Sequence, residues 1–438
     1  MIPQPQSLTA NCSSLLRTMT KLLCAAIFSV AVLAQAQTLQ VLYNFTGGSD
    51  GQYPSGGLTI DAVGNLYGTA PLGGNFGGSC GPQEPYSGCG TVFKLSHRGT
   101  GWTFTPLYAF RGDDFNYDGA NPEGGVVFGP DGSLYGTTLN GGGGNCTYYN
   151  DGCGTAFKLS LPATVCKAAL CPWNEKVIYS VARDKGQESY GNVAFDSAGN
   201  LYGTVTLGGQ LDGGYVYELT PSNGQWTEQI VHWFDPDNED CNAPMAGVLL
   251  DASGNLYGTA NNGCHTLYGG VFQFQPSGSG WNENILLNFN GFGDGDGSVA
   301  ALASDSHGNL YGTTDDLGPN GGGTIFELTP SDGGWVYSLV YGFGKFGQGA
   351  YPTAPVTVDA SGNLYGSTGK TAVDSGNGLV FEMTPSNGAW TETVLHYFLG
   401  TDGLYPSGNV VIDAHGNLYG TTSMGGAYGY GVIWEITP

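Results

Sequence analysis

The sequence predicts an all-β protein, a seven-bladed β-propeller in which each blade has four antiparallel strands. Three observations predict this fold class. A phrase of the form Asp-x-x-Gly-Asn-Leu-Tyr-Gly-Thr occurs seven times with variations, two alternating runs follow each copy, and one alternating run stands alone before the first copy. The last five copies are 54 or 55 residues apart, and self-similarity at a fixed period is typical of repeat architectures. The central tyrosines of the copies are Tyr67, Tyr135, Tyr202, Tyr257, Tyr311, Tyr365 and Tyr419.

The phrase predicts a two-stranded β-hairpin. In the first copy an alternating run from Gly57 to Ile60 leads into Asp61-Ala-Val-Gly-Asn, and a second run begins at Leu66. Asp is favoured at the start of a tight turn, and Gly adopts the left-handed conformation without a steric penalty. Each copy therefore supplies the first two strands of a unit.

Two further runs supply the third and fourth strands. One has the pattern Gly-x-Val-Phe-x-Leu, as from Gly378 to Met383, and the other opens on Trp and closes on Phe, as from Trp390 to Phe398. Both alternate with the period of a strand. A unit is thus four strands in about 54 residues, close to the roughly 40 to 50 residues of known propeller repeats.

The two ends of the chain predict how the ring closes. The seventh unit stops at Pro438 before its fourth strand, whereas the run from Leu39 to Phe45 precedes the first hairpin and has no unit of its own. Pairing this run with the run from Gly431 to Ile436 would complete the last blade and leave no open sheet edge. We therefore expect a single domain, residues 37–438, closed by its N-terminal strand.

Residues 1–36 are predicted to be a secretory signal peptide, with Met19 as an alternative start. A basic region around Lys21, an apolar run from Leu22 to Leu33 and a small-residue site at Ala34-Gln-Ala36 follow the order of such signals. No other stretch is apolar enough to span a bilayer. The mature protein is therefore expected to be secreted, periplasmic or at the cell surface.

The cysteines agree with export. Without Cys12 and Cys24, which lie in the leader, the remaining cysteines fall as local pairs. Even numbers in an exported chain are typical of disulfides, and the spacing does not fit a zinc site. The expected disulfides are Cys80–Cys89, Cys146–Cys153, Cys166–Cys171 and Cys241–Cys264.

The charge balance excludes two classes of partner. The chain has 12 basic and 36 acidic residues and a formal net charge of -24. Such a surface repels nucleic acid and anionic lipid. Neutral polymers, proteins and cations remain as partners, and we expect a monomer.

The inserted residues predict where the protein binds its ligand. The turns between strands one and two, and between strands three and four, lie on one face of a propeller, which we call the turn face. The other connections lie on the opposite face, the loop face, and hold nearly all insertions. Long loops on a rigid scaffold commonly carry function. The candidate ligand-binding residues break the repeat on the loop face: Phe76, Tyr86, Tyr117, Tyr148, Tyr149, His265 and Tyr268.

One motif on the loop face predicts a calcium site. Asp114, Asn116 and Asp118 alternate as in the opening of a calcium loop, where a tight turn gathers oxygen ligands. The bidentate Glu that closes such a loop is absent. The alternative is a plain Asp-Gly turn, which other units carry at Asp50 and Asp402.

Catalytic signals are sparse. No Ser-His-Asp order, phosphate-binding loop or metal triad can be picked out. Paired acids could run glycoside hydrolysis, and Asp315 with Asp316, or Glu84 with Asp113, are candidates on the loop face. The protein is therefore expected to bind rather than to catalyse.

The outermost strands are expected to present charged residues to water, as protected sheet edges do. These residues are Glu228, Glu283 and Glu392.

The repeat resembles a known family. The phrase, with Gly-Gly and Gly-x-Val-Phe-Glu-Leu-Thr-Pro after it, resembles the GloVer tandem repeat of bacterial exported proteins over residues 39–438. Its clearest copies run from Asp305 to Thr314 and from Asp413 to Thr422, while the second copy departs with Gly129 and Ser133 in place of Asp and Asn. The resemblance implies a fold and export but no defined activity. The hairpin is also similar, more distantly, to those of NHL-type propellers.

These observations together predict a module that binds an extracellular ligand on the loop face, either a polysaccharide or another macromolecule such as a protein. Two alternatives stay open. One is a polysaccharide-degrading enzyme, a glycoside hydrolase or lyase, that uses acids of that face, and the other is a structural or adhesive surface protein. Propellers host all three functions. Calcium is the one cofactor expected.

Overall fold

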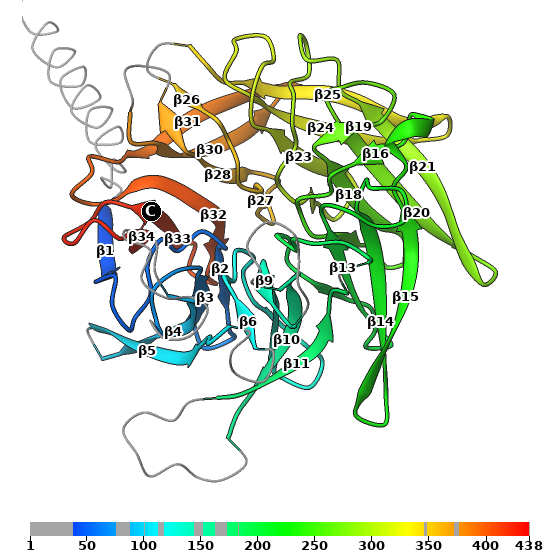
Figure 1. Ribbon diagram of the computed structural model, residues 1–438. Coiled ribbons are helices and arrows are strands. Elements are labelled where there is room, and N and C mark those ends of the chain that lie inside the picture. Colours follow the sequence, from blue (N-terminus) through cyan, green and yellow to red (C-terminus); the bar gives the residue numbers. More distant parts are fainter. Residues whose placement is uncertain are drawn as a thin grey trace, which may run out of the picture.

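The structure is a computed structural model that describes residues 38–75, 88–99, 101–112, 118–143, 152–162, 173–182, 184–345, 348–371 and 376–437. Within these residues, seven four-stranded antiparallel sheets form a ring of blades (Figure 1). The predicted seven-bladed β-propeller is thus confirmed. None of the helices in this part of the chain is long and apolar enough to cross a membrane.

The blades are numbered along the chain, and the strands of each are given from the channel outward. Blade 1 contains β2 (Leu58–Ile60), β3 (Leu66–Ala70), β4 (Thr91–Arg98) and β5 (Gly101–Ala109). Blade 2 contains β7 (Val127–Phe128), β8 (Leu134–Thr138), β10 (Thr155–Ser160) and β11 (Asn174–Ser180). Blade 3 contains β12 (Ala194–Phe195), β13 (Leu201–Val205), β14 (Tyr215–Ser222) and β15 (Gln225–Trp233). Blade 4 contains β17 (Leu249–Leu250), β18 (Leu256–Ala260), β20 (Gly270–Ser277) and β21 (Gly280–Asn288).

The remaining blades follow the same order. Blade 5 contains β22 (Ala303–Ser304), β23 (Leu310–Thr314), β24 (Thr324–Ser331) and β25 (Gly334–Gly342). Blade 6 contains β27 (Thr357–Val358), β28 (Leu364–Thr368), β30 (Leu379–Ser386) and β31 (Ala389–Tyr397). Blade 7 contains β32 (Leu404–Ile412), β33 (Leu418–Met424), β34 (Val432–Thr437) and β1 (Thr38–Asn44).

Short two-stranded ladders extend some blades toward the loop face. They are β6 (Gly119–Ala120) with β9 (Asn140–Gly141), β16 (Cys241–Asn242) with β19 (Asn262–Gly263), and β26 (Gly349–Ala350) with β29 (Lys370–Thr371). A 3-10 turn, η2 (Pro236–Asn238), precedes β16.

The ring closes as predicted, through the N-terminal strand. β1 pairs antiparallel with β34, so that Leu39 lies opposite Ile436 and Asn44 opposite Val432. Figure 1 shows the blue β1 beside the red β34. Phe45, which follows β1, is fully buried and packs edge-on against Phe93 of blade 1. The first and last parts of the described chain therefore share one sheet.

The repeat phrase is a self-capped hairpin. In blade 1, Asp61 Oδ1 accepts hydrogen bonds from the backbone N–H groups of Val63 (3.0 Å) and Asn65 (2.8 Å). Asp61 Oδ2 accepts from Asn65 Nδ2 (2.7 Å) and from the hydroxyl of Tyr67 (3.0 Å). Burial acts to raise the pKa of Asp61, but these hydrogen bonds outweigh it and hold the pKa below its usual value. The same hydroxyl-to-carboxylate bond recurs at Tyr202, Tyr257, Tyr311, Tyr365 and Tyr419.

The Gly and Thr of the phrase serve packing between strands and between blades. A Cβ atom on Gly68 would lie 2.6 Å from Cζ of Phe93 on the neighbouring strand, so only glycine leaves room for that buried ring. Thr69 Oγ1 donates a hydrogen bond of 2.9 Å to the carbonyl of Gly124 in blade 2. Equivalent bonds to the next blade are made by Thr137, Thr204, Thr259 and Thr313.

Blade 2 keeps the hairpin by moving the acid two residues along the chain. Asp131 accepts from the backbone N–H of Ser133 (3.0 Å) and from the Tyr135 hydroxyl (3.3 Å). A Cβ atom on Gly129 would lie 2.3 Å from the Tyr135 ring, which explains the glycine at the position where other copies carry Asp. The departure is therefore a local exchange that preserves the turn.

The repeat tyrosines pack against the next blade, as expected. Tyr202 meets Trp281 edge-on at 6.0 Å, Tyr257 meets Trp335 at 5.8 Å, and Tyr311 meets Trp390 at 6.2 Å. Each tryptophan opens the outermost strand of the following blade. Aromatic pairs in this geometry stabilise a fold beyond the area that they bury.

The prediction that the outer-strand glutamates face water is wrong. The hydroxyl of Tyr179 in blade 2 donates to Glu228 of blade 3 (2.6 Å), and Tyr341 of blade 5 donates to Glu392 of blade 6. The Glu228 side chain is only 14% exposed. One side of each of these outermost strands faces the preceding blade, so the glutamates on that side are half-buried there instead of solvated.

Candidate binding site on the loop face

Most predicted site residues lie outside the part of the chain that the structure describes. This holds for five candidate ligand-binding residues, two calcium ligands and four cysteines: Phe76, Tyr86, Tyr117, Tyr148, Tyr149, Asp114, Asn116, Cys80, Cys146, Cys166 and Cys171. These predictions stay untested. The described candidates are His265, Tyr268, Asp118, Cys89, Cys153, Cys241 and Cys264.

The disulfide predicted between two neighbouring loops is present. Cys241 and Cys264 are bonded, with their Cα atoms 4.0 Å apart, and join β16 to the loop that follows β19. Cys89 and Cys153 are also disulfide-bonded. Their predicted partners lie outside the described residues. The Cys241–Cys264 bond therefore pins a loop of blade 4 on the loop face.

His265 and Tyr268 lie on the same loop but have different surroundings. His265 Nδ1 is 3.0 Å from Glu239 Oε2, and more than half of the His265 side chain is exposed. Tyr268 is half-buried, and its ring occupies the space beside Gly291 in the connection to blade 5. His265 is thus a surface residue in contact with Glu239, whereas Tyr268 also supports the loop.

The structure adds an exposed apolar cluster beside Tyr268. Leu267 is 84% exposed, Phe292 is 83% exposed, and Leu317 is 36% exposed. The loops that carry Phe292 and Leu317 are joined by a backbone hydrogen bond of 3.0 Å from Gly318 N to Gly291 O. We call Leu267, Tyr268, Phe292 and Leu317 the blade 4–5 cluster. Contiguous exposed apolar residues often mark a binding surface.

Carboxylates border the blade 4–5 cluster. Asp296 and Asp316 face one another in a backbone bridge, with Asp296 N 3.0 Å from Asp316 O. Burial, together with the charges of Asp316 and Asp296, raises the pKa of Asp315 to about 6. The acid pair predicted at 315 and 316 is therefore brought together with a third acid, Asp296, beside exposed apolar side chains.

Other loop-face connections also expose apolar side chains. Most of the large exposed apolar residues in the described part of the chain lie on this face, and they are Leu207, Leu211, Leu267, Phe292, Leu317, Tyr351, Leu399 and Tyr428. Sequence reasoning missed them because a single apolar residue in an irregular loop has no periodic signal.

The central channel opens on the same face. A cavity of about 210 Å³ is lined by residues of all seven blades, which in blades 1 to 6 come from the segment just before the inner strand. Its acid is Glu123, which accepts a hydrogen bond of 2.8 Å from Ser55 Oγ. Burial raises the pKa of Glu123, and the bond from Ser55 only partly offsets that effect. The Glu123 carboxyl that lines the channel therefore has a pKa above its usual value.

Asp118, a predicted calcium ligand, closes a loop. Its oxygens accept from the Tyr108 hydroxyl (2.9 Å), Arg111 N (3.0 Å) and Gly119 N (2.8 Å). Asp50 has the matching role in the connection to blade 1, where it accepts from the Tyr43 hydroxyl and Thr46 N. This geometry favours the Asp-Gly turn, while calcium binding with Asp114 and Asn116 stays a prediction.

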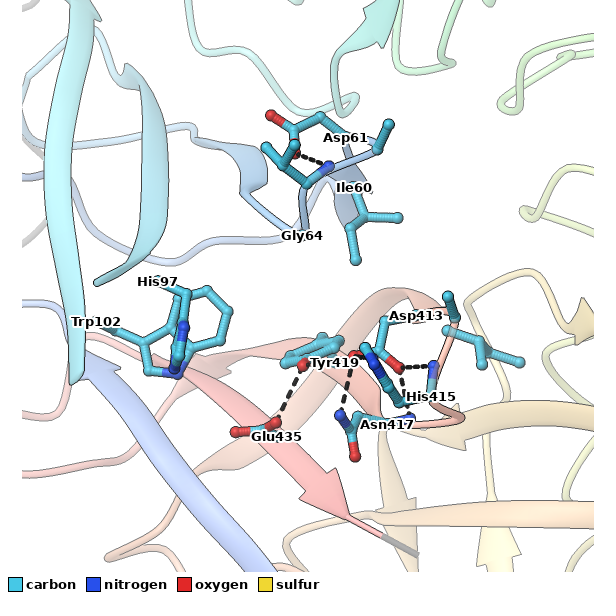
Figure 2. Close-up of a pocket in the computed structure, with 14 residues that line it drawn as sticks. Ile60, Asp61, Gly64, His97, Trp102, Asp413, His415, Asn417, Tyr419 and Glu435 are labelled. Carbon is cyan, nitrogen blue, oxygen red and sulfur yellow. Dashed lines mark hydrogen bonds and ion pairs between the residues drawn. The ribbon is translucent and has the colours of Figure 1, made fainter. Parts of the chain in front are cut away.

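A larger cavity lies on the turn face, between blades 7 and 1. It holds about 520 Å³, and Figure 2 shows Tyr419 between Trp102 on one side and the turn with Asp413 and His415 on the other. The Tyr419 hydroxyl donates to Asp413 (3.1 Å) and to Glu435 (3.0 Å). A similar cavity of about 490 Å³ between blades 2 and 3 contains Tyr135 and Trp226. The cavity is therefore a product of the Tyr–Trp packing that the repeat generates at several seams.

One group of three residues whose side chains can bind a metal ion was not predicted from the sequence. His232, Asp240 and Glu283 meet at the outer seam between blades 3 and 4. They come from two different repeats, so no local spacing reveals them. With the structure known, a sequence pattern for this group can be stated. His232 lies two residues before the closing Phe234 of one unit, and Glu283 lies in the Trp-x-Glu sequence of the next unit.

Comparison with solved structures finds the same fold at low sequence identity. The extracellular domain of a candidate one-component system from B. thetaiotaomicron is 11% identical with a TM-score of 0.50, over 92% of this chain and 40% of that one. An ulvan lyase, described as a new family of polysaccharide lyase, is 10% identical with a TM-score of 0.49, over 88% and 94% of the two chains. PorZ, a surface component of the type-IX secretion system of Porphyromonas gingivalis, is 14% identical with a TM-score of 0.48 over 88% of this chain. The chain spans 46% of the length of PorZ.

Likeness at this level concerns the fold alone. A comparison with curated proteins finds no match. The sequence does match the Gloeobacter/Verrucomicrobia repeat over residues 149–370 and again over residues 268–438, which together make up more than half of the chain. The protein therefore belongs to the Gloeobacter/Verrucomicrobia repeat family, as the resemblance of its repeat indicated.

Proposed function

We propose that the protein is an exported binding module whose ligand is an extracellular polysaccharide held at the blade 4–5 cluster. One observation carries this proposal: exposed apolar side chains and carboxylates lie next to each other on the loop face. Leu267 and Phe292 are largely exposed, and Asp296 and Asp316 lie beside them. Binding sites commonly combine apolar surface with a few well-placed polar groups.

The chemistry of the cluster suits a neutral or cationic sugar polymer. The rings of Phe292 and Tyr268 can contact the apolar face of a sugar, while carboxylates accept hydrogen bonds from its hydroxyl groups. The formal charge of -24 opposes binding of a strongly anionic polymer. A polymer of this kind is therefore the expected substrate class of the site.

Disulfides support the proposed compartment. Cys241–Cys264 is formed, and Cys89 and Cys153 are disulfide-bonded. Disulfides persist in oxidising environments outside the cytosol. Together with the predicted signal peptide at residues 1–36, they support export to the periplasm, the cell surface or the medium.

A binding panel tests the proposal. The purified protein would be incubated with insoluble and soluble polysaccharides of neutral, cationic and anionic character, and its depletion from solution measured. We expect depletion by at least one neutral or cationic polymer. Phe292→Ala should weaken that binding by about tenfold or more, as loss of an aromatic anchor does, whereas Val63→Ala on the turn face should not. If no polymer depletes the protein, or if both variants bind like the wild type, the proposal fails.

A second candidate function is cleavage of the bound polysaccharide. Asp315, with its pKa raised to about 6, could serve as a general acid near neutral pH, and Asp316 is an adjacent carboxylate. New reducing or unsaturated ends in the same panel would support an enzyme, provided that Asp315→Asn abolishes them. Depletion without products would leave the protein a binding module.

A further inference from the structure

The outer seam between blades 3 and 4 brings an imidazole and two carboxylates together. His232 belongs to β15, Asp240 to the connection after it, and Glu283 to β21 of the next blade. His232 Nε2 is 2.8 Å from Asp240 Oδ2 and 3.6 Å from Glu283 Oε2. One ligand atom from each residue lies within 4.8 Å of the others.

The imidazole is held in place by aromatic packing. The His232 ring lies edge-on to Phe234, with ring centres 5.0 Å apart, and tilted against Phe274 at 5.1 Å. These contacts leave Nε2 directed at the two carboxylates. A ring fixed in this way loses little conformational freedom when it binds a ligand. Residues around a metal-binding histidine commonly hold its ring in one orientation in this manner.

The two carboxylates differ in how they are satisfied. Asp240 Oδ1 accepts from Cys241 N (2.7 Å), and Asp240 Oδ2 accepts from Asp235 N (2.9 Å) besides facing His232. Glu283 Oε1 is buried and has no hydrogen-bond partner among the described residues. A buried carboxylate oxygen without a partner is costly, and a bound cation would satisfy it.

Equivalent seams show that this combination is not a general feature of the repeat. Between blades 1 and 2, Tyr108 takes the place of the histidine beside Asp118. Between blades 6 and 7, His396 Nε2 lies 2.9 Å from Asp402 Oδ2, but no third ligating group joins them in the described residues. The seam of blades 3 and 4 therefore combines three groups, namely the Asp that these seams have in common, an imidazole and a second acid.

We propose that this seam binds one divalent first-row transition metal ion, with Zn²⁺ as the preferred case, through His232 Nε2, Asp240 and Glu283. Zinc takes histidine nitrogen and carboxylate oxygen at about 2.0 to 2.2 Å, so tetrahedral ligands lie about 3.4 Å apart. The separations of 2.8 and 3.6 Å bracket that value. The fourth position is left for water.

The nitrogen ligand separates this site from the calcium site predicted at Asp114 to Asp118. Calcium takes oxygen ligands, six to eight in number, whereas imidazole suits zinc and other transition metals. A zinc ion here would link β15 of blade 3 to β21 of blade 4. It would therefore brace the same interblade region that the Cys241–Cys264 disulfide pins on the loop face.

The test uses the full chain, stripped with a chelator and then titrated with Zn²⁺ by calorimetry, and with Co²⁺ by its visible absorption. We expect one high-affinity site, a higher melting temperature with Zn²⁺, and no competition from millimolar Ca²⁺. His232→Gln and Glu283→Gln should each weaken binding by at least about 10- to 100-fold, the loss seen even for residues that only support a metal ligand. His396→Gln is the matched control, since it alters the equivalent histidine of blade 6 and should leave binding unchanged.

Three results would overturn the proposal. The first is no Zn²⁺ binding by the stripped wild type at millimolar metal. The second is binding that survives in both His232→Gln and Glu283→Gln. The third is binding lost equally in His396→Gln or in His265→Gln, because the metal would then lie elsewhere or on the surface. Melting curves of the metal-free variants separate loss of binding from loss of folding.

Discussion

Single residues of the repeat phrase each carry a distinct physical task. The Asp caps the turn, the Tyr joins that Asp to the next blade, the Gly leaves space for an aromatic ring, and the Thr bonds to the neighbouring backbone, as seen at Asp305, Tyr311, Gly312 and Thr313. Each task belongs to a different side chain, so single substitutions can test them one at a time.

The glycine of the phrase is predicted to be a packing requirement. A Cβ atom on Gly312 would lie 2.4 Å from Phe326 Cζ and 2.9 Å from Leu302 Cδ2, and both side chains are buried. Overpacking of this kind costs about 1–3 kcal/mol, so Gly312→Ala should lower the free energy of unfolding in urea by that amount. Gly333→Ala, where no atom lies within 4 Å, should change it by less than about 0.5 kcal/mol. Equal losses in the two variants would contradict the packing account.

One buried acid is predicted to make stability depend on pH. Burial, reinforced by the charge of Asp118, raises the pKa of Glu175 to about 8, and Glu175 Oε1 has no partner in the described residues. Because the folded pKa is above the unfolded one, the protonated form stabilises the fold at low pH, and this stability is lost as the pH rises from about 4.5 through 8. Glu175→Gln should therefore melt higher than the wild type at pH 8 but not at pH 4.5. Glu239→Gln, an exposed control, should show no such difference, and a wild-type-like pH profile in Glu175→Gln would rule out this role.

Among the strands, β1 closes the ring by joining the first and last parts of the described chain. It supplies the fourth strand of blade 7 from the opposite end of the described chain. Its pairing with β34 was predictable, because the repeat count left one strand without a partner at each end. The register and the burial of Phe45 could not be predicted, since they depend on the packing of blade 1 against blade 7.

Removing β1 is predicted to expose an unpaired strand edge that promotes association. Deletion of residues 38–45 leaves the outer edge of β34 unpaired, and an unpaired strand edge is a template for association with other chains. The truncated protein should melt lower and form dimers or larger species in light scattering. A synthetic peptide of residues 38–45 should reverse both effects. A truncated chain that stays monomeric with an unchanged melting temperature would show that β1 does not close the ring.

The outer strands show where element-level prediction fails. Alternation correctly identifies β15 and β21, but it does not reveal which side of an outermost strand meets water. Glu228 and Glu283 proved half-buried because that side packs against the preceding blade. For the same reason the contact of Glu283 with His232 could not be foreseen, since it joins two repeats.

At the scale of the molecule, the repeat predicts the fold but does not predict the residues of the candidate binding site. Seven similar four-stranded units, with the last one completed by a strand from the other end of the described chain, form a closed ring. The turn face repeats one hairpin, so the irregular loop face was the predictable place for function. The residues that form the blade 4–5 cluster were only partly predictable, because Tyr268 broke the repeat visibly but Phe292 and Leu317 did not.

We propose that the ligand binds on the loop face, at the blade 4–5 cluster. Hydroxyl-radical footprinting of the protein, with and without a saturating polysaccharide from the binding panel, tests it most directly. We expect protection of Leu267, Tyr268 and Phe292, while Trp102 and His415 in the turn-face cavity react as before. Protection of Trp102 and His415 with an unchanged loop face would contradict the account and place the site at the seam of blades 7 and 1.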